Sequence, residues 1–473
     1  MGNIVDLNEY PRDINEAIAS STDSNDLIVK LLSRYNNTGD TLYLDTAIAK
    51  AQEAIQQLSS KNSLEDTELR TVLWTNLNGA MLSRYDGTGD AADLDAAIAS
   101  IEQAVKDTPS DHPELASRLG SLSKTQLKQY GRTGDSYCLK RAYSNADRAV
   151  KMASRNDPAR LSLLVALSTA LAHLYEQTGE FATLERAISL AKEALGNVSG
   201  DIDPADKSYE ELSRERATVL STLASLRYMR FKQKHDVEDL VGAISNMREA
   251  TSLTSSSHPL SKSLLNNLGA ILFAKYEHPP HDQNDLDDAI SKVREAIEAS
   301  PEFHPDLAGR LNNLSKMLYS QYKATRNIQC LEDAIAAGKK AAGLTSELQR
   351  DTQVSSHSPS NNTSLSSAEL ALSKLWRSFH PSKTKSPAYA ARLSSLSAMQ
   401  LELYELKQQL TDLDEAIAYG RKAVVLTPLC DPNLADRLRH LEQALVRHFE
   451  LTGDVKDREE ADALIDERER LGN

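Results

Sequence analysis

Apolar residues recur in this chain at the spacing of an amphipathic helix, and the same pattern returns many times. Each copy has a leucine, here called the anchor leucine, with a large apolar residue three positions before it and an aromatic residue eight positions after it. These spacings place all three on one helical stripe and predict a first helix in every copy. The anchor leucines are Leu77, Leu122, Leu167, Leu223, Leu268, Leu314, Leu396 and Leu441.

A second apolar pattern, typically Leu-x-x-Ala-Ile, follows each anchor leucine after about 20 residues. Its alanine, here called the repeat alanine, opens a run of small and aliphatic residues at helical spacing, as from Ala47 to Ile55. This pattern predicts a second helix whose alanine lets two helices touch. The repeat alanines, which number the copies one to nine, are Ala47, Ala97, Ala142, Ala187, Ala243, Ala289, Ala334, Ala416 and Ala461.

A turn signal separates the two predicted helices. Five copies carry a glycine there, which adopts the left-handed conformation that closes a helix, and in four of them an aspartate follows that can cap the next helix. In copies five and seven His235 and Arg326 replace the glycine, so we expect those turns to close differently. The turn glycines are Gly39, Gly89, Gly134, Gly179 and Gly453.

Successive repeat alanines are 50, 45, 45, 56, 46, 45, 82 and 45 residues apart. A period in the middle forties is typical of a helical solenoid, in which each unit packs only on its neighbours. We therefore expect one all-α solenoid over residues 1–473. Residues 1–30 are expected to form a degenerate N-terminal cap and residues 449–473, which are rich in charge, a C-terminal capping unit. The long spacing holds a Ser-rich insertion at 346–387 that we expect to be largely disordered.

Composition narrows the classes of partner. The net charge is −14, the wrong sign for a protein dedicated to binding nucleic acid, which needs many uncompensated cations. The first residues have no apolar signal core, and no stretch approaches the roughly 18 apolar residues of a membrane span. Three well-separated cysteines, Cys138, Cys330 and Cys430, fit a reducing compartment. We expect a cytoplasmic protein that binds neither nucleic acid nor membrane.

The sequence has no recognisable reaction chemistry. It lacks a glycine-rich phosphate loop, a metalloprotease helix, a paired CxxC motif and a nucleophile elbow. His278, His281 and Asp282 lie together in the segment EHPPHDQ, but no second ligand cluster accompanies them, and we interpret the segment as an inserted turn. We expect no catalytic residue, no metal site and no cofactor.

The repeat resembles the tetratricopeptide repeat (TPR), with a first helix and turn longer than in the usual 34-residue unit. The stretch HPDLAGRLNNLSKMLYSQY, from His304 to Tyr322, and the stretch YDGTGDAADLDAAI, from Tyr85 to Ile98, resemble the TPR regions of fungal proteins that often end in a caspase-like CHAT domain. The resemblance covers nearly the whole chain and implies a right-handed superhelical solenoid of about nine TPR-like hairpins. The catalytic segments of a CHAT domain are not recognisable.

In the TPR family the first helices line a concave groove that takes a peptide or helix of a partner. Carried over to this chain, that arrangement implies groove positions two before, two after and six after each anchor leucine. The polar candidates there are Lys124, Lys128, His173, Asn266, Asn312, Lys316, Arg439 and Arg447. Each of them can equally be a solvated position on a helix, and nothing in the residues decides between the two interpretations.

The resemblance therefore implies a non-enzymatic scaffold that binds a protein or peptide partner, of unspecified oligomeric state. An alternative is the sensor or regulatory arm of a CHAT caspase-like protease or of a nucleotide-switch receptor, separated from its effector. A third alternative is a regulatory subunit that activates an enzyme in trans.

Overall fold

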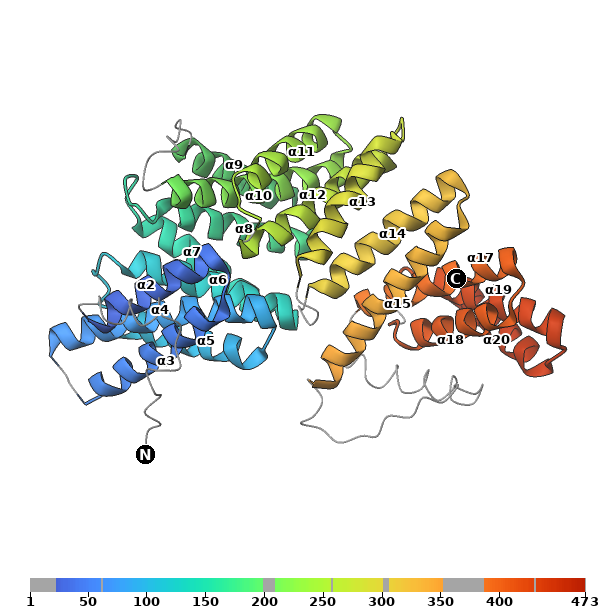
Figure 1. Ribbon diagram of the computed structural model, residues 1–473, viewed down its shortest axis with the longest axis horizontal. Helices are drawn as coiled ribbons and strands as arrows, with labels where there is room; N and C mark the ends of the chain where they lie inside the picture. The colour runs from blue at the N-terminus through green and yellow to red at the C-terminus, as the bar shows by residue number, and fades with distance from the viewer. Residues whose placement is uncertain are drawn as a thin grey trace. The chain divides into compact units, whose positions relative to one another are not determined.

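The computed structural model describes residues 23–60, 63–198, 209–256, 258–300, 306–351, 387–428 and 431–472. All the regular secondary structure in these ranges is helical (Figure 1). The chain divides into two compact units, residues 1–281 and residues 282–473.

In the first unit the helices are α2 (Ser24–Thr38), α3 (Thr41–Leu58), α4 (Leu64–Thr88), α5 (Ala91–Asp107), α6 (Leu115–Thr133), α7 (Ser136–Met152), α8 (Arg160–Thr178), α9 (Phe181–Asn197), α10 (Tyr209–Lys234), α11 (Val237–Ser252) and α12 (Pro259–Glu277). In the second unit they are α13 (Gln283–Glu298), α14 (Leu307–Thr325), α15 (Ile328–Asp351), α17 (Pro387–Lys407), α18 (Leu410–Val425), α19 (Leu434–Thr452) and α20 (Val455–Gly472).

Within each unit, paired helices such as α4 and α5 or α17 and α18 form hairpins, and each hairpin packs on the next one in that unit. In the first unit, for example, α4 contacts α5 within its hairpin and α6 in the following copy. The repeat alanines lie in these contacts, as Ala97 and Ala187 show by being completely buried. A methyl group at this position lets the two helices approach closely. The expected all-α solenoid of helical hairpins is confirmed.

The turns between paired helices close as the sequence predicts where glycine is present. Gly89 and Gly179 have φ values of 73° and 70°, and the N–H group of each donates to a tyrosine carbonyl at 2.7 Å. The expectation that His235 and Arg326 close their turns differently was wrong. Both adopt the left-handed conformation, with φ of 56° and 59°, and donate to the equivalent aromatic carbonyl at 2.7 Å. Packing of the flanking helices imposes this conformation at a cost of about 1 kcal/mol.

The residue after the anchor leucine joins the two helices of its hairpin. The hydroxyl of Ser168 donates to the carbonyl of the repeat alanine Ala187 at 2.8 Å, and Ser397 donates to Ala416 at 2.7 Å. Copy two has the longer Asn78 at this position, and its Nδ2 donates to the carbonyl of its own repeat alanine, Ala97, at 3.0 Å.

The ends of the array and the insertion fall partly outside the described residues. Of the expected N-terminal cap, residues 1–22 lie outside them, and the remainder belongs to α2, where Ile28 is fully buried. Residues 352–386 of the insertion also lie outside them, while α15 continues to Asp351. The C-terminal unit contains α20, in which Leu464 is fully buried. These domain boundaries stay predictions.

Candidate partner-binding surface

The structure places all eight candidate groove residues on first helices, and it divides them between the two units. The first unit holds Lys124 and Lys128 on α6, His173 on α8 and Asn266 on α12. The second unit holds Asn312 and Lys316 on α14, with Arg439 and Arg447 on α19.

Lys124 has the most unusual surroundings of the eight. Its side chain is open to solvent, yet the protein atoms around it lower the pKa of its ammonium group through desolvation. The carboxylate of Glu215 on α10, two copies further along the array, partly opposes this shift. Among the eight candidates, Lys124 is therefore the one whose surroundings differ most from those of a solvated helix face.

His173 and Lys128 lie on neighbouring first helices of the same unit. The ring of His173 packs edge-on against Tyr130 of α6, with 5.6 Å between ring centroids, and its Nδ1 lies 2.9 Å from the Glu176 carboxylate. The hydrogen bond from His173 is the main reason why the pKa of Glu176 is lowered. Lys128 pairs with Asp86 of α4 at 2.7 Å. The structure thus brings His173 against α6, whereas the Lys128 ammonium turns toward α4.

The other candidates have ordinary surroundings. In the second unit Arg439 and Arg447 form ion pairs with acids three residues away on α19, at 3.1 and 3.0 Å. Lys316 is exposed, and both Asn266 and Asn312 are half-buried. Exposed ion pairs of this kind contribute at most about 1 kcal/mol to the free energy of unfolding and are typical of a solvated helix face. The structure does not assemble these residues into one cluster.

Sequence reasoning missed a set of ionic bridges that tie neighbouring copies together. In copy two, Arg84 donates through Nε and Nη2 to Asp93 of its own hairpin at 2.9 and 2.6 Å, and through Nη1 to Asp45 of the preceding copy at 2.8 Å. These hydrogen bonds raise the pKa of the Arg84 guanidinium, with that to Asp93 the largest cause. Planar guanidinium matches two carboxylates in this way better than ammonium does.

The same bridge returns in copies five and nine. Arg230 donates to Asp239 at 2.7 and 2.5 Å and to Glu185 of the preceding copy at 3.1 Å. In copy nine His448 takes the place of the arginine, 2.5 Å from Asp457 and 3.3 Å from Asp414. The sequence signal is a basic residue seven positions after the anchor leucine together with an aspartate four positions before the repeat alanine.

Where that basic residue is absent, the aspartate is generally absent too. Copies three and seven have glutamine facing cysteine, with Gln129 accepting from Cys138 at 3.2 Å and Gln321 from Cys330 at 3.5 Å. The two cysteines therefore belong to the scaffold. This pairing of residue types is a rule of the repeat that could have been read from the sequence by comparing its copies.

No metal-binding arrangement is found among the residues that the structure describes. They include no group of three or more His, Cys, Asp and Glu side chains placed to hold a metal ion. The Nδ1 atoms of His278 and His281 lie against backbone carbonyls at 3.1 and 2.8 Å. Among the same residues, no helix has the length and apolar character needed to cross a membrane.

Several solved structures are similar to this chain. No family model and no curated protein matches it. The thermophilic TPR protein TTC0263 of Thermus thermophilus is 21% identical over 52% of this chain and 99% of its own, with a TM-score of 0.35. The apo quorum sensor NprR of B. thuringiensis is 12% identical over 94% and 100%, with a TM-score of 0.43. Human IFIT1, as a dimer with m7Gppp-AAAA, is 15% identical over 97% and 84%, with a TM-score of 0.42.

Proposed function

Starting from the TPR-like array of helical hairpins, we propose that this protein is a non-enzymatic scaffold that binds a peptide segment or helix of a protein partner along the first helices of its first unit. The observation that carries the proposal is the setting of Lys124, which is open to solvent although protein surrounds it. A lysine held in this way is partly desolvated before any partner arrives, so an acidic group that reaches it loses little by binding there.

Neighbouring residues extend this contact surface. His173 is half-buried beside Tyr130 and offers an aromatic face together with a ring nitrogen. An amphipathic partner segment with an acidic side chain fits such a combination, because aromatic residues supply contact area while the ammonium group sets the register. The net charge of −14 favours a protein partner over a nucleic acid.

The test is affinity purification of the full chain with matched charge reversals. Lys124→Glu changes the proposed surface, and Lys140→Glu makes the same change at an exposed position of the second helix α7. We expect the partner to be recovered with the wild-type chain and with Lys140→Glu, and to be lost with Lys124→Glu. Equal recovery with all three chains would contradict the proposed surface. Turnover of a substrate by the purified chain alone would contradict a non-enzymatic role.

A further inference from the structure

Copy eight breaks the pairing rule of the repeat. Seven positions after its anchor leucine, where copies two and five have arginine, it has Leu403. Both acidic partners of that missing arginine are nevertheless present. Asp412 occupies the position of Asp239, and Glu332 of the preceding copy occupies the position of Glu185. Copy eight thus keeps the two carboxylates of the bridge without the cation that joins them elsewhere.

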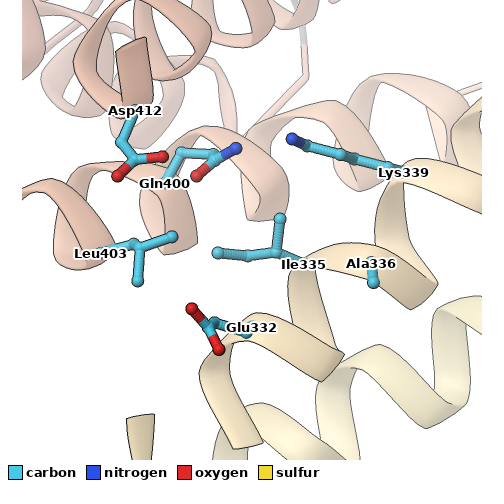
Figure 2. A pocket seen from close by; sticks show the side chains of 7 residues that line it. All are labelled: Glu332, Ile335, Ala336, Lys339, Gln400, Leu403 and Asp412. Carbon is cyan, nitrogen blue, oxygen red and sulfur yellow. The ribbon is translucent and has the colours of Figure 1, made fainter. Parts of the chain in front are cut away.

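A pocket of about 230 Å³ lies at this place in the second unit. Its walls come from α15, α17 and the start of α18, as Figure 2 shows. Leu403, Ile335 and Ala336 form an apolar part, and the polar lining residues are Asp412, Gln400, Glu332 and Lys339. The volume is well above the roughly 15 Å³ that one water molecule needs, and is large enough for the end of a side chain.

Two acceptor atoms in the pocket have no hydrogen-bond partner. Gln400 is 1% exposed, and its Nε2 donates to Glu415 while its Oε1 has no partner. In Figure 2 this amide oxygen lies on the side facing Asp412. Oδ2 of Asp412 is also buried without a partner, and desolvation raises the pKa of this carboxyl. A buried acceptor without a donor costs about 1–3 kcal/mol, so the two atoms together form a site for a missing donor.

The surrounding charges leave Asp412 as the carboxylate that no cation pairs with in this pocket. The ammonium of Lys407 binds Glu332, and that of Lys339 binds Glu415 at 2.5 Å. Both lysines lower the pKa of Asp412 at a distance, while Glu415 and Glu332 raise it. A donor that enters the pocket therefore meets the unpartnered oxygens of Asp412 and Gln400, and beside them the carboxylate of Glu332, which Lys407 already binds on one side.

We propose that this pocket binds the side chain of an arginine from a partner protein, with the guanidinium group between Asp412 and Glu332 and the aliphatic stem against Leu403 and Ile335. The entering group takes the place that Arg84 and Arg230 occupy in their own copies. In those copies one guanidinium makes two hydrogen bonds to the acid of its hairpin and at least one to the acid of the preceding copy.

Guanidinium fits this site better than the other cations. A divalent metal needs a set of convergent ligands, and the described residues include no group of three or more acidic, histidine or cysteine side chains placed to hold one. A lysine ammonium is a single point charge, whereas the acceptors here come from three side chains in two copies. The apolar wall is suited to the methylene groups of a long side chain.

This site rests on the proposed scaffold function and adds a second point at which a partner is recognised. It can be tested independently of the surface around Lys124. The probe N-acetyl-arginine amide requires no partner, so its binding does not depend on the result at Lys124. The matched probe is N-acetyl-citrulline amide, which has almost the same shape and no charge. The methyl group of Ile335, observed by NMR in the full chain, reports binding inside the pocket.

We expect the arginine probe to shift the Ile335 signal in a saturable way and the citrulline probe to leave it unchanged. Asp412→Asn is expected to weaken binding by at least about tenfold, as loss of a hydrogen bond to a charged group does. Leu403→Arg is expected to abolish binding because its own guanidinium fills the site. Leu174→Arg, the same change in copy four, is expected to bind like the wild type.

Three results would overturn the proposal. The first is an equal response to both probes, or no response of Ile335 to either. The second is undiminished binding of the arginine probe to Leu403→Arg. The third is displacement of the arginine probe by calcium chloride at the same concentration, which would identify the pocket as a site for a small cation.

Discussion

In copies five and eight the same two acids flank the bridge position, one from the copy itself and one from the preceding copy. Only copy five has a cation between them. In copy five Arg230 fills the space, and the largely buried Asp239 is held by two hydrogen bonds from it. In copy eight Leu403 leaves a pocket in which an oxygen of Asp412 is buried without a donor. A repeat can thus create a binding site by omitting one side chain from an otherwise unchanged pattern.

The two copies also distinguish positions that maintain the fold, here called framework positions, from the position at which the proposed binding site forms. Framework positions, such as the anchor leucine and the repeat alanine, are buried alike in both copies, whereas the bridge position differs. In a repeat protein the internal copies provide the standard against which one unusual copy can be recognised. We expect variants at framework positions to have equal effects in the two regions and variants at the bridge position to have opposite effects.

Removing the filled bridge should have the largest effect. Arg230→Met leaves Asp239 buried without its cation, and loss of one partner of a buried pair costs about 3 kcal/mol of unfolding free energy. The measurement is urea denaturation of the full chain. The double variant Arg230→Met with Asp239→Asn should recover most of the loss. If the single variant were as stable as the wild type, the bridge would contribute nothing.

Placing an arginine at the bridge position of copy eight should increase the free energy of unfolding. Leu403→Arg gains hydrogen bonds to charged groups worth about 1.5–3 kcal/mol and loses part of the apolar burial of one leucine, so we expect a net gain of about 1 kcal/mol. The control is Leu174→Arg, which faces Thr183 and Lys140 by position in the repeat and should lose stability. Destabilisation of both variants by similar amounts would show that copy eight has no vacant cation site.

A change at a framework position should cost nearly the same in copy eight as in copy four, which serves here because copy five has Ala224 in place of the serine. Ser168→Ala and Ser397→Ala each remove one hydrogen bond to a repeat alanine, which is worth about 1 kcal/mol. Urea denaturation of the two variants measures both losses. A loss in copy eight that is much smaller than the loss in copy four would mean that the hairpin of copy eight is itself irregular. The open pocket would then need a different explanation.

The pH dependence should show the smallest effect. Because the folded protein raises the pKa of Asp412 above the ordinary 3.8, the ionised carboxylate destabilises the fold. That cost is absent below the unfolded pKa and appears as the pH rises through the folded pKa. Asp412→Asn should therefore gain stability over the wild type as the pH rises above the unfolded pKa, and urea denaturation at a series of pH values measures the gain. A wild-type advantage that grows with pH would contradict the assignment.

Much of the fold could be predicted from the sequence because its causes are local. The anchor leucine, the repeat alanine and the turn glycine each have a backbone or packing requirement that a single copy displays. The prediction for the turns at His235 and Arg326 was wrong because the cause there is not local. There the flanking helices impose a left-handed residue that local preference disfavours, and only the packed structure shows which of the two effects is stronger.

The candidate sites depend on relations that one copy cannot display. One charge that acts on Lys124 is that of Glu215 on α10, two copies away, which the position of the lysine in its own helix does not reveal. The pocket at Leu403 is visible only when the bridge position is compared between copies and the acid of the preceding copy is included. The residue pairs themselves were present in the sequence, and the comparison of copies is what identifies them.

The most direct test of this account is the crystal structure of the Leu403→Arg variant. We expect the new guanidinium to donate to Asp412 and to Glu332, with the geometry that Arg230 has toward Asp239 and Glu185, and the pocket to be filled. An arginine side chain that instead points into solvent, with the Asp412 oxygen still lacking a donor, would contradict the claim that copy eight preserves the site of the missing cation.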